Sequence, residues 1–297
     1  ADVPYLHGML AFAWEQCHAL EQAEACARRA LALRDKEPWA QHALAHVMLT
    51  QGRLHEGHAF LAGVSGTWTG LNSFMVTHNW WHQALFALEL DDIDEALALY
   101  DQRVWGVEKA YTQDQVNAVS LLARIELAGG NAGARWDELA GWLADRTQDQ
   151  VLPFLDLQYL YGLARAGRAE ADVLATNLER QASNAGGVWR DVCLPAAHGL
   201  LAHARGDWAR AVDGLARALP RMAEIGGSHA QRDLFEQIHL DALLRAGRRP
   251  GAQHLLQQRL RAAPESRRLA RQARALYASL GLDAAVPVFL ATRGSAT

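Results

Sequence analysis

The chain has 297 residues, half of them apolar, and a net charge of −4 with an isoelectric point near 6.4. This apolar content excludes an intrinsically disordered chain, and the length suffices for one large domain or two smaller ones. The charge balance provides no basic surface for nucleic acid, and no apolar run is long enough to span a bilayer. We therefore expect a globular protein with neither nucleic-acid nor membrane partners, of undetermined oligomeric state.

The three cysteines, Cys17, Cys26 and Cys193, show no CxxC spacing. They therefore indicate neither a disulfide framework nor a cysteine zinc site, and their small number suits a reducing compartment. We predict a cytoplasmic location. Cys193 is followed by His198, but nothing in the sequence activates the thiol, so we interpret it as a small core residue.

Eight prolines in a chain rich in Ala, Leu, Glu and Arg favour an all-α protein. Helical repeats recur in chain order. Residues 20–33 resemble the second helix of a tetratricopeptide (TPR) unit, and Gly57 falls 34 residues after Ala23, the period of that unit. Residues 199–220 carry small residues where two antiparallel helices of such a unit cross closely.

The repeats predict an α-solenoid of about seven TPR-like helix-turn-helix pairs, wound as a right-handed superhelix within a single domain over residues 1–297. We expect a last helix near residues 267–280 to cap the stack, and the basic run 265–275 to be a solvated helix face. An irregular helical bundle is the alternative. The predicted turns lie near residues 18–21, 51–55, 90–93, 129–133, 165–169, 205–208 and 246–251.

Two histidine pairs stand on the first helices of pairs two and three. His42 and His46 are four residues apart, as are His78 and His82, so each pair occupies one helix face. The first helices of neighbouring pairs pack about 8–10 Å apart. The two pairs are therefore expected to face each other across one groove.

Further polar residues interrupt apolar first helices and are candidates to line the same groove, because a buried charge needs a partner or a ligand. Asn79 and Trp81 lie inside the second histidine pair; Trp80 and Trp81 are about 100° apart around a helix, so we expect only one to border the groove. We also expect Ser228 to cap a helix beside arginines, which suits an anion. The remaining candidates are His7, Asp114, Asn117, Asp156, Gln158, Arg190, Asp191, Gln231, Arg232 and Asp233.

The residues HGMLAF (7–12), HALAH (42–46), HNWWHQAL (78–85), ALALYD (96–101), RDVCLP (190–195) and GGSHAQRDLF (226–235) resemble the tetratricopeptide repeat protein 38 family. They extend over nearly the whole chain. The resemblance implies an all-helical repeat fold and, before Ala1, a further helical segment. It implies no settled biochemical activity.

Two functions of different classes remain open. In the first, the groove binds a peptide segment or small, possibly anionic, ligand through the histidines and arginines, as repeat solenoids usually do. In the second, the chain is a metal-dependent or acid–base enzyme, with a divalent transition metal such as zinc bound by His42, His46, His78 and His82. Neither pair contains the glutamate of the H-E-x-x-H motif, so the catalytic residues stay unknown. A scaffold without ligand is a third possibility.

The sequence HEGH at residues 55–58 is a weaker candidate for metal or ligand binding, since it lies at a turn where histidines are usually solvated. Arg190 with Asp191, and Arg232 with Asp233, are expected to form ion pairs or to bind an anionic ligand.

Overall fold

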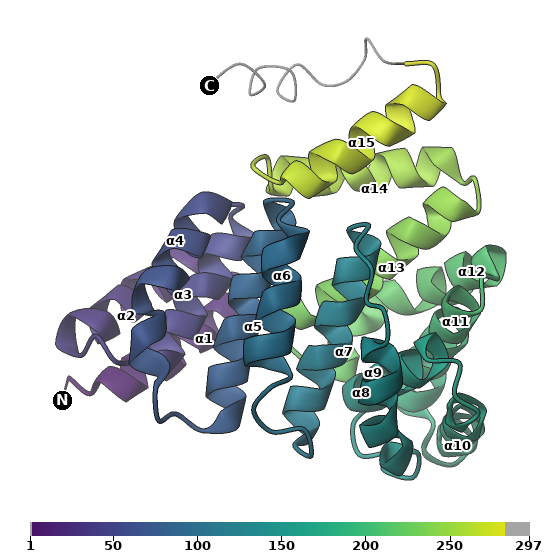
Figure 1. Ribbon diagram of the computed structural model, residues 1–297, viewed down its shortest axis with the longest axis horizontal. Helices are drawn as coiled ribbons and strands as arrows, with labels where there is room; N and C mark the ends of the chain where they lie inside the picture. Colours follow the sequence, from purple (N-terminus) through teal and green to yellow (C-terminus); the bar gives the residue numbers. More distant parts are fainter. Residues whose placement is uncertain (1, 283–297) are drawn as a thin grey trace. The chain divides into compact units, whose positions relative to one another are not determined.

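The computed structural model describes residues 2–282, which form fifteen α-helices, five short 3-10 or π turns and no strand (Figure 1). The predicted all-α class is thus confirmed. The chain divides into two compact units, one made of Ala1–Ala96 and Arg249–Thr297, the other of Leu97–Arg248. Among the described residues, no helix has the length and apolar character needed to cross a membrane. The single-domain assignment stays a prediction.

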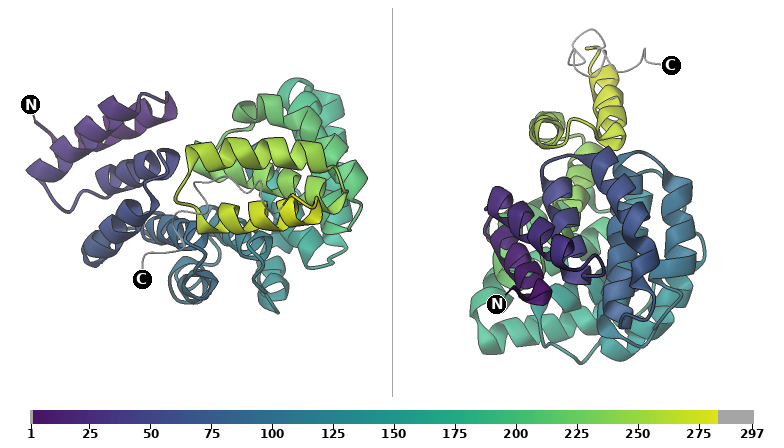
Figure 2. Two further views of the ribbon diagram at one scale, coloured as in Figure 1. Left: turned by 90° about the horizontal axis from the view of Figure 1, so that it is seen from above. Right: turned by 90° about the vertical axis from the view of Figure 1, so that its left-hand side faces the viewer.

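The first unit is built from consecutive antiparallel helices, and α1 to α4 lie side by side in both views of Figure 2. A C-terminal pair of helices belongs to the same unit. The helices of the first unit are α1 (Pro4–Gln16), α2 (Leu20–Leu33), α3 (Pro38–Thr50), α4 (Leu54–Val64), α5 (Ser73–Glu89), the start of α6 (Ile93–Leu99), α14 (Arg249–Ala262) and α15 (Arg267–Ser279).

Local sequence explains where these helices begin and how closely they pack. Proline occupies the first turn of α1 and α3, where its missing N–H costs nothing. The Asn72 side chain caps α5 by accepting a hydrogen bond from the backbone N–H of Met75. Gly8 lies against the backbone of Ala40, so α1 and α3 approach closely. The core formed around these crossings is largely alanine and leucine.

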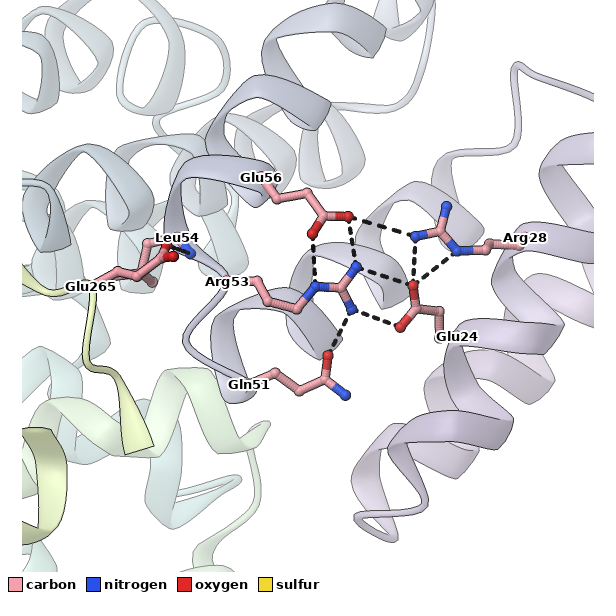
Figure 3. A network of polar contacts seen from close by, with 7 residues as sticks. All are labelled: Glu24, Arg28, Gln51, Arg53, Leu54, Glu56 and Glu265. Atoms are coloured by element: carbon pink, nitrogen blue, oxygen red, sulfur yellow. Dashed lines mark hydrogen bonds and ion pairs between the residues drawn. The ribbon is translucent and has the colours of Figure 1, made fainter. Parts of the chain in front are cut away.

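Ion pairs add to this packing on the outside of the unit (Figure 3). Arg53, in the turn between α3 and α4, donates hydrogen bonds to Glu24 on α2 and to Glu56 on α4. Arg28 bonds the same Glu24. Each exposed pair is worth only about 0.2–1 kcal/mol, so the network supports a register that burial already determines.

The second unit continues the succession of antiparallel helices. It also contains two π turns, Tyr100–Val104 and Trp189–Cys193, and 3-10 turns that include Leu219–Ile225. The helices are α7 (Thr112–Leu127), α8 (Arg135–Leu143), α9 (Pro153–Arg165), α10 (Glu170–Ala185), α11 (Leu194–Ala204), α12 (Trp208–Ala218) and α13 (His229–Arg245).

Small residues also allow α11 and α12 to cross closely. A Cβ atom at Gly214 would lie 2.8 Å from backbone atoms of Gly199 and from the carbonyl of Pro195. No side chain can move to relieve that contact, so only glycine fits. Ser228 caps α13, as predicted, and the side chain of Gln231 completes a capping box by accepting a hydrogen bond from the backbone N–H of Ser228.

Every predicted turn coincides with a break between consecutive helices, and the predicted last helix coincides with α15. This succession is consistent with an α-solenoid. The basic run on α15 is mostly a solvated face, as predicted, since Arg267, Arg271 and Arg274 are exposed, but Arg268 differs from the prediction. Arg268 is 2% exposed because its guanidinium pairs with Glu89 at the end of α5.

Candidate metal centre

The four histidines of the two pairs converge in the first unit. His42 and His46 lie on α3, His78 and His82 on α5, and all four are between 0 and 3% exposed. Helical spacing explains the convergence: residues four apart share a face, and the two helices present these faces to each other. The structure thus brings together the residues that the sequence offered as ligands.

The distances are those of a compact cluster. The Nε2 atoms of His42 and His46 are 3.1 Å apart. Across the two helices, the ring centroids of His42 and His82 are 5.0 Å apart and those of His46 and His82 are 4.5 Å apart. One nitrogen from each of the four residues lies within 4.8 Å of the other three.

This spacing approaches that of a coordination shell. Zn–N bonds of 2.0–2.1 Å in a tetrahedron place the nitrogen atoms about 3.3 Å apart. The pair on α3 already meets that separation, and the whole set needs a contraction of at most about 1.5 Å. Small rotations of imidazole rings and a slight approach of α3 to α5 provide such a contraction.

Burial keeps the imidazole of His42 in the form that binds a metal. Burial lowers the pKa of His42 well below its ordinary value, and the neighbouring His46 and His78 lower it further. At neutral pH His42 is therefore an uncharged imidazole with a free lone pair. A metal ion does not have to compete with a proton there.

Glu15 supplies a carboxylate behind the cluster. It is fully buried on α1, and its Oε2 atom lies 3.5 Å from Nδ1 of His46. Its other oxygen accepts a hydrogen bond from the hydroxyl of Thr50, at 3.5 Å. Nε2 of His46 lies near Nε2 of His42, whereas Nδ1 lies on the side of the carboxylate and makes no hydrogen bond to a described residue. Behind metal-bound histidines a carboxylate commonly accepts a hydrogen bond from this second nitrogen.

Aromatic rings enclose the cluster on several sides. Phe12 contacts His42 and His46, with ring centroids 5.0 and 5.4 Å apart. His78 stacks with Phe74 and with Trp81, with ring centroids 5.0 Å apart in each pair. This shell lowers the local dielectric and limits access of water, which strengthens nitrogen–metal bonds relative to hydration.

Two predicted residues of α5 adjoin the cluster. Trp81 is fully buried against His78 and His82, whereas Trp80 is half-buried against Trp68. Asn79 is fully buried, and neither atom of its amide has a hydrogen-bond partner among the described residues. An unsatisfied buried amide is costly and calls for an explanation.

The other predicted residues lie outside this cluster. His7 is half-buried near the start of α1 and contacts Asp2. HEGH provides no cluster either, because His58 pairs with Glu95 on α6. The candidates of the second unit, Asp114, Asn117, Asp156 and Gln158, are buried on α7 and α9.

The arginine candidates of the second unit have structural partners. Arg190 is exposed and pairs with Asp191 at 2.8 Å, as predicted. Arg232 donates to the carbonyls of Gly226 and Gly227, and Asp233 lies 3.8 Å from Arg124. Gln231 belongs to the helix cap. These contacts hold the loop before α13.

Cys193 is buried, and burial raises the pKa of its thiol, so it is an inert core residue as interpreted. Glu15 and Phe12 are the residues that the sequence argument missed. A signal for Glu15 exists: it follows Gly8 and Ala11 at helical spacing, on the face that α1 buries against the unit.

No protein-family model matches the chain. The resemblance to the tetratricopeptide repeat protein 38 family therefore stays a prediction, and the four-histidine cluster is the feature from which a function has to be inferred.

Proposed function

We propose that this protein is a helical-repeat metal-binding protein that holds one late first-row transition-metal ion between α3 and α5. The observation that carries the proposal is the set of four buried histidines whose ligating atoms lie within 4.8 Å of one another. Imidazole nitrogens suit Zn²⁺, Cu²⁺ and Ni²⁺, whereas Mg²⁺ and Ca²⁺ prefer oxygen. Zinc is the ion that fits a tetrahedral shell of four such ligands best.

The burial of the cluster bears on what the ion does. Four protein ligands fill a tetrahedral shell, which is the arrangement of structural zinc sites, whereas catalytic sites keep one position for water. The aromatic shell also leaves the histidines at most 3% exposed. We therefore propose that the ion links α3 to α5 and stabilises the fold, in preference to metal-dependent catalysis or a peptide groove lined by these histidines.

The scaffold in this proposal is a right-handed superhelix of about seven TPR-like pairs, capped at its C-terminal end and located in the cytoplasm. The support is the succession of helix pairs with breaks at the predicted turns. Small residues at the crossings, such as Gly57 and Gly199, support it further.

Elemental mass spectrometry on untagged protein tests the proposal. We expect near-stoichiometric metal in the wild type after equilibration with zinc and dialysis. His46→Ala and His82→Ala should each lose it, because each removes one ligand. The matched control is His198→Ala, which removes an exposed histidine paired with Glu179 in the second unit.

Metal retained by His198→Ala but lost from both cluster variants supports the site. Circular dichroism should show that the variants remain helical. A wild type that binds no zinc, copper or nickel would overturn the proposal. So would metal that both cluster variants retain.

A further inference from the structure

The loop between α14 and α15 contacts the ends of both helices that carry the histidines. On the α3 side it lies against the turn at Gly52, which has a φ of +69°. A Cβ atom there would lie 2.6 Å from the carbonyl oxygen of Ala262 and 2.8 Å from Cα of Ala263. The loop is therefore in van der Waals contact with the turn that follows α3.

A carboxylate from the same loop caps the next helix. Glu265 accepts a hydrogen bond from the backbone N–H of Leu54, at 3.0 Å (Figure 3), and another from that of His55, at 3.3 Å. These are free donors of the first turn of α4, and a negative charge is favourable at that end of a helix. This interaction fixes the loop to the turn between α3 and α4.

On the α5 side the loop is held by a buried ion pair. Glu89, the last residue of α5, accepts a hydrogen bond from the hydroxyl of Ser266 and one of 2.5 Å from Arg268. Arg268 is 2% exposed, so its charge depends on this partner. Asp91 pairs with Arg271 at 2.7 Å just beyond the end of the helix.

These contacts lie close to the histidine cluster along the two helices. Gly52 follows His46 by six residues, and Glu89 follows His82 by seven. At 1.5 Å per residue these separations are about 9 and 10 Å. One loop therefore joins the C-terminal ends of α3 and α5 within about two turns of the ligands.

The histidine cluster is wider than a closed coordination shell, which bears on the two helix ends that this loop contacts. The four ligating atoms lie within 4.8 Å, whereas a tetrahedral shell needs about 3.3 Å. Rotation of the imidazole rings and an approach of α3 to α5 both contribute to closing the shell, and the loop contacts the end of each helix. We infer that the α14–α15 hairpin is a clamp coupled to the metal site, docking more firmly when the ion is bound.

This inference builds on the proposed metal site and adds its regulation. Coupling between two sites is reciprocal: if the docked clamp increases metal affinity by some factor, the metal increases docking by the same factor. A partner or modification that releases the hairpin would thereby release the ion. The clamp thus connects the C-terminal hairpin to the metal content of the protein.

The test combines zinc affinity with hydrogen exchange on the full chain. Zinc affinity is measured by competition with a fluorescent chelator in the wild type, Glu89→Gln and Asp2→Asn. Glu89→Gln removes the charge that holds Arg268. The control Asp2→Asn removes an exposed ion pair with Arg29 in the same unit.

We expect Glu89→Gln to bind zinc about tenfold more weakly, within the usual range of coupling between sites, and Asp2→Asn to bind as the wild type does. Zinc should slow the exchange of amides in α15 in the wild type and not in Glu89→Gln. If Glu89→Gln destabilises α15 but changes neither the zinc affinity nor the slowing of amide exchange by zinc, the clamp is only structural.

If Glu89→Gln proves unfolded by circular dichroism, Glu265→Gln provides the same comparison without leaving an arginine charge buried. A wild type that binds no zinc overturns both the metal site and the clamp. If the wild type binds zinc and every variant binds it with the same affinity, the clamp alone is overturned.

Discussion

Gly57 on α4 is a position where one methyl group should destabilise the first unit. A Cβ atom there would lie 2.2 Å from Cζ and 2.3 Å from Cε1 of Phe86 on α5. Phe86 is fully buried in the core, so its ring cannot turn into solvent. Gly57→Ala therefore forces the ring or the helix to move by more than 1 Å.

Two opposing contributions set the size of the effect. Alanine stabilises a helix interior by about 1 kcal/mol relative to glycine, whereas overpacking a core costs about 1–3 kcal/mol. A contact this short lies at the upper end of that range, so we expect a net loss of about 1–2 kcal/mol. Gly63, on the same helix, has no atom within 4 Å of its Cβ position. Gly63→Ala should stabilise by about 0.5–1 kcal/mol.

Urea unfolding followed by circular dichroism measures both variants against the wild type. A double variant, Gly57→Ala with Phe86→Leu, isolates the clash, because the smaller side chain should accommodate the methyl group. We expect a favourable coupling of at least about 1 kcal/mol. Equal stability of Gly57→Ala and Gly63→Ala would refute the packing argument.

Three further predictions follow from other sites. Glu15→Gln should lower zinc affinity about 10- to 100-fold by competition titration, because it removes the carboxylate behind the cluster. Burial raises the pKa of Asp156 from 3.8 to about 7. The stability that its neutral form provides is therefore complete below about pH 4 and is lost as the pH rises through 7. Asp156→Asn should remove this pH-dependent loss, which is about a few kcal/mol and is measured by urea unfolding at pH 4 and pH 8. His203 bonds the hydroxyl of Tyr161 at 3.1 Å and Asp241 at 2.8 Å, so His203→Leu should lower the unfolding free energy by about 2–3 kcal/mol, and Tyr161→Phe by about 1.

Much of the helical succession could be predicted because its signals are local. A glycine in five of the seven predicted turns and a 34-residue spacing of small residues, such as Ala23 and Gly57, carry that information; His18 and Asp91 adopt a positive φ in the two turns that lack a glycine. That the two histidines of each pair share one helix face follows from the helical period in the same way. The burial of Arg268 did not follow, since its partner Glu89 is 179 residues away in the chain.

The histidine cluster illustrates the same limit. Spacing within one helix indicated which histidines share a face, but the contribution of α1 depends on tertiary packing. Glu15 lies 31 residues before His46, and only the close approach of α1 to α3 at Gly8 places the two side chains together. The polar residues of the second unit looked similar in sequence, yet Arg232 and Gln231 serve the loop and cap before α13.

The repeat itself explains why four histidines meet at one point. His78 follows His42 by 36 residues, and His82 follows His46 by the same 36. The histidines at these corresponding positions on α3 and α5 meet in the structure, with ring centroids 5.0 Å apart for His42 and His82 and 4.5 Å apart for His46 and His82. His7 precedes His42 by 35 residues, but Ala11 occupies the position that corresponds to His46. At these spacings α3 and α5 each carry two histidines, whereas α1 carries only His7. The contribution of α1 next to the cluster is instead the carboxylate of Glu15, which lies beside His46.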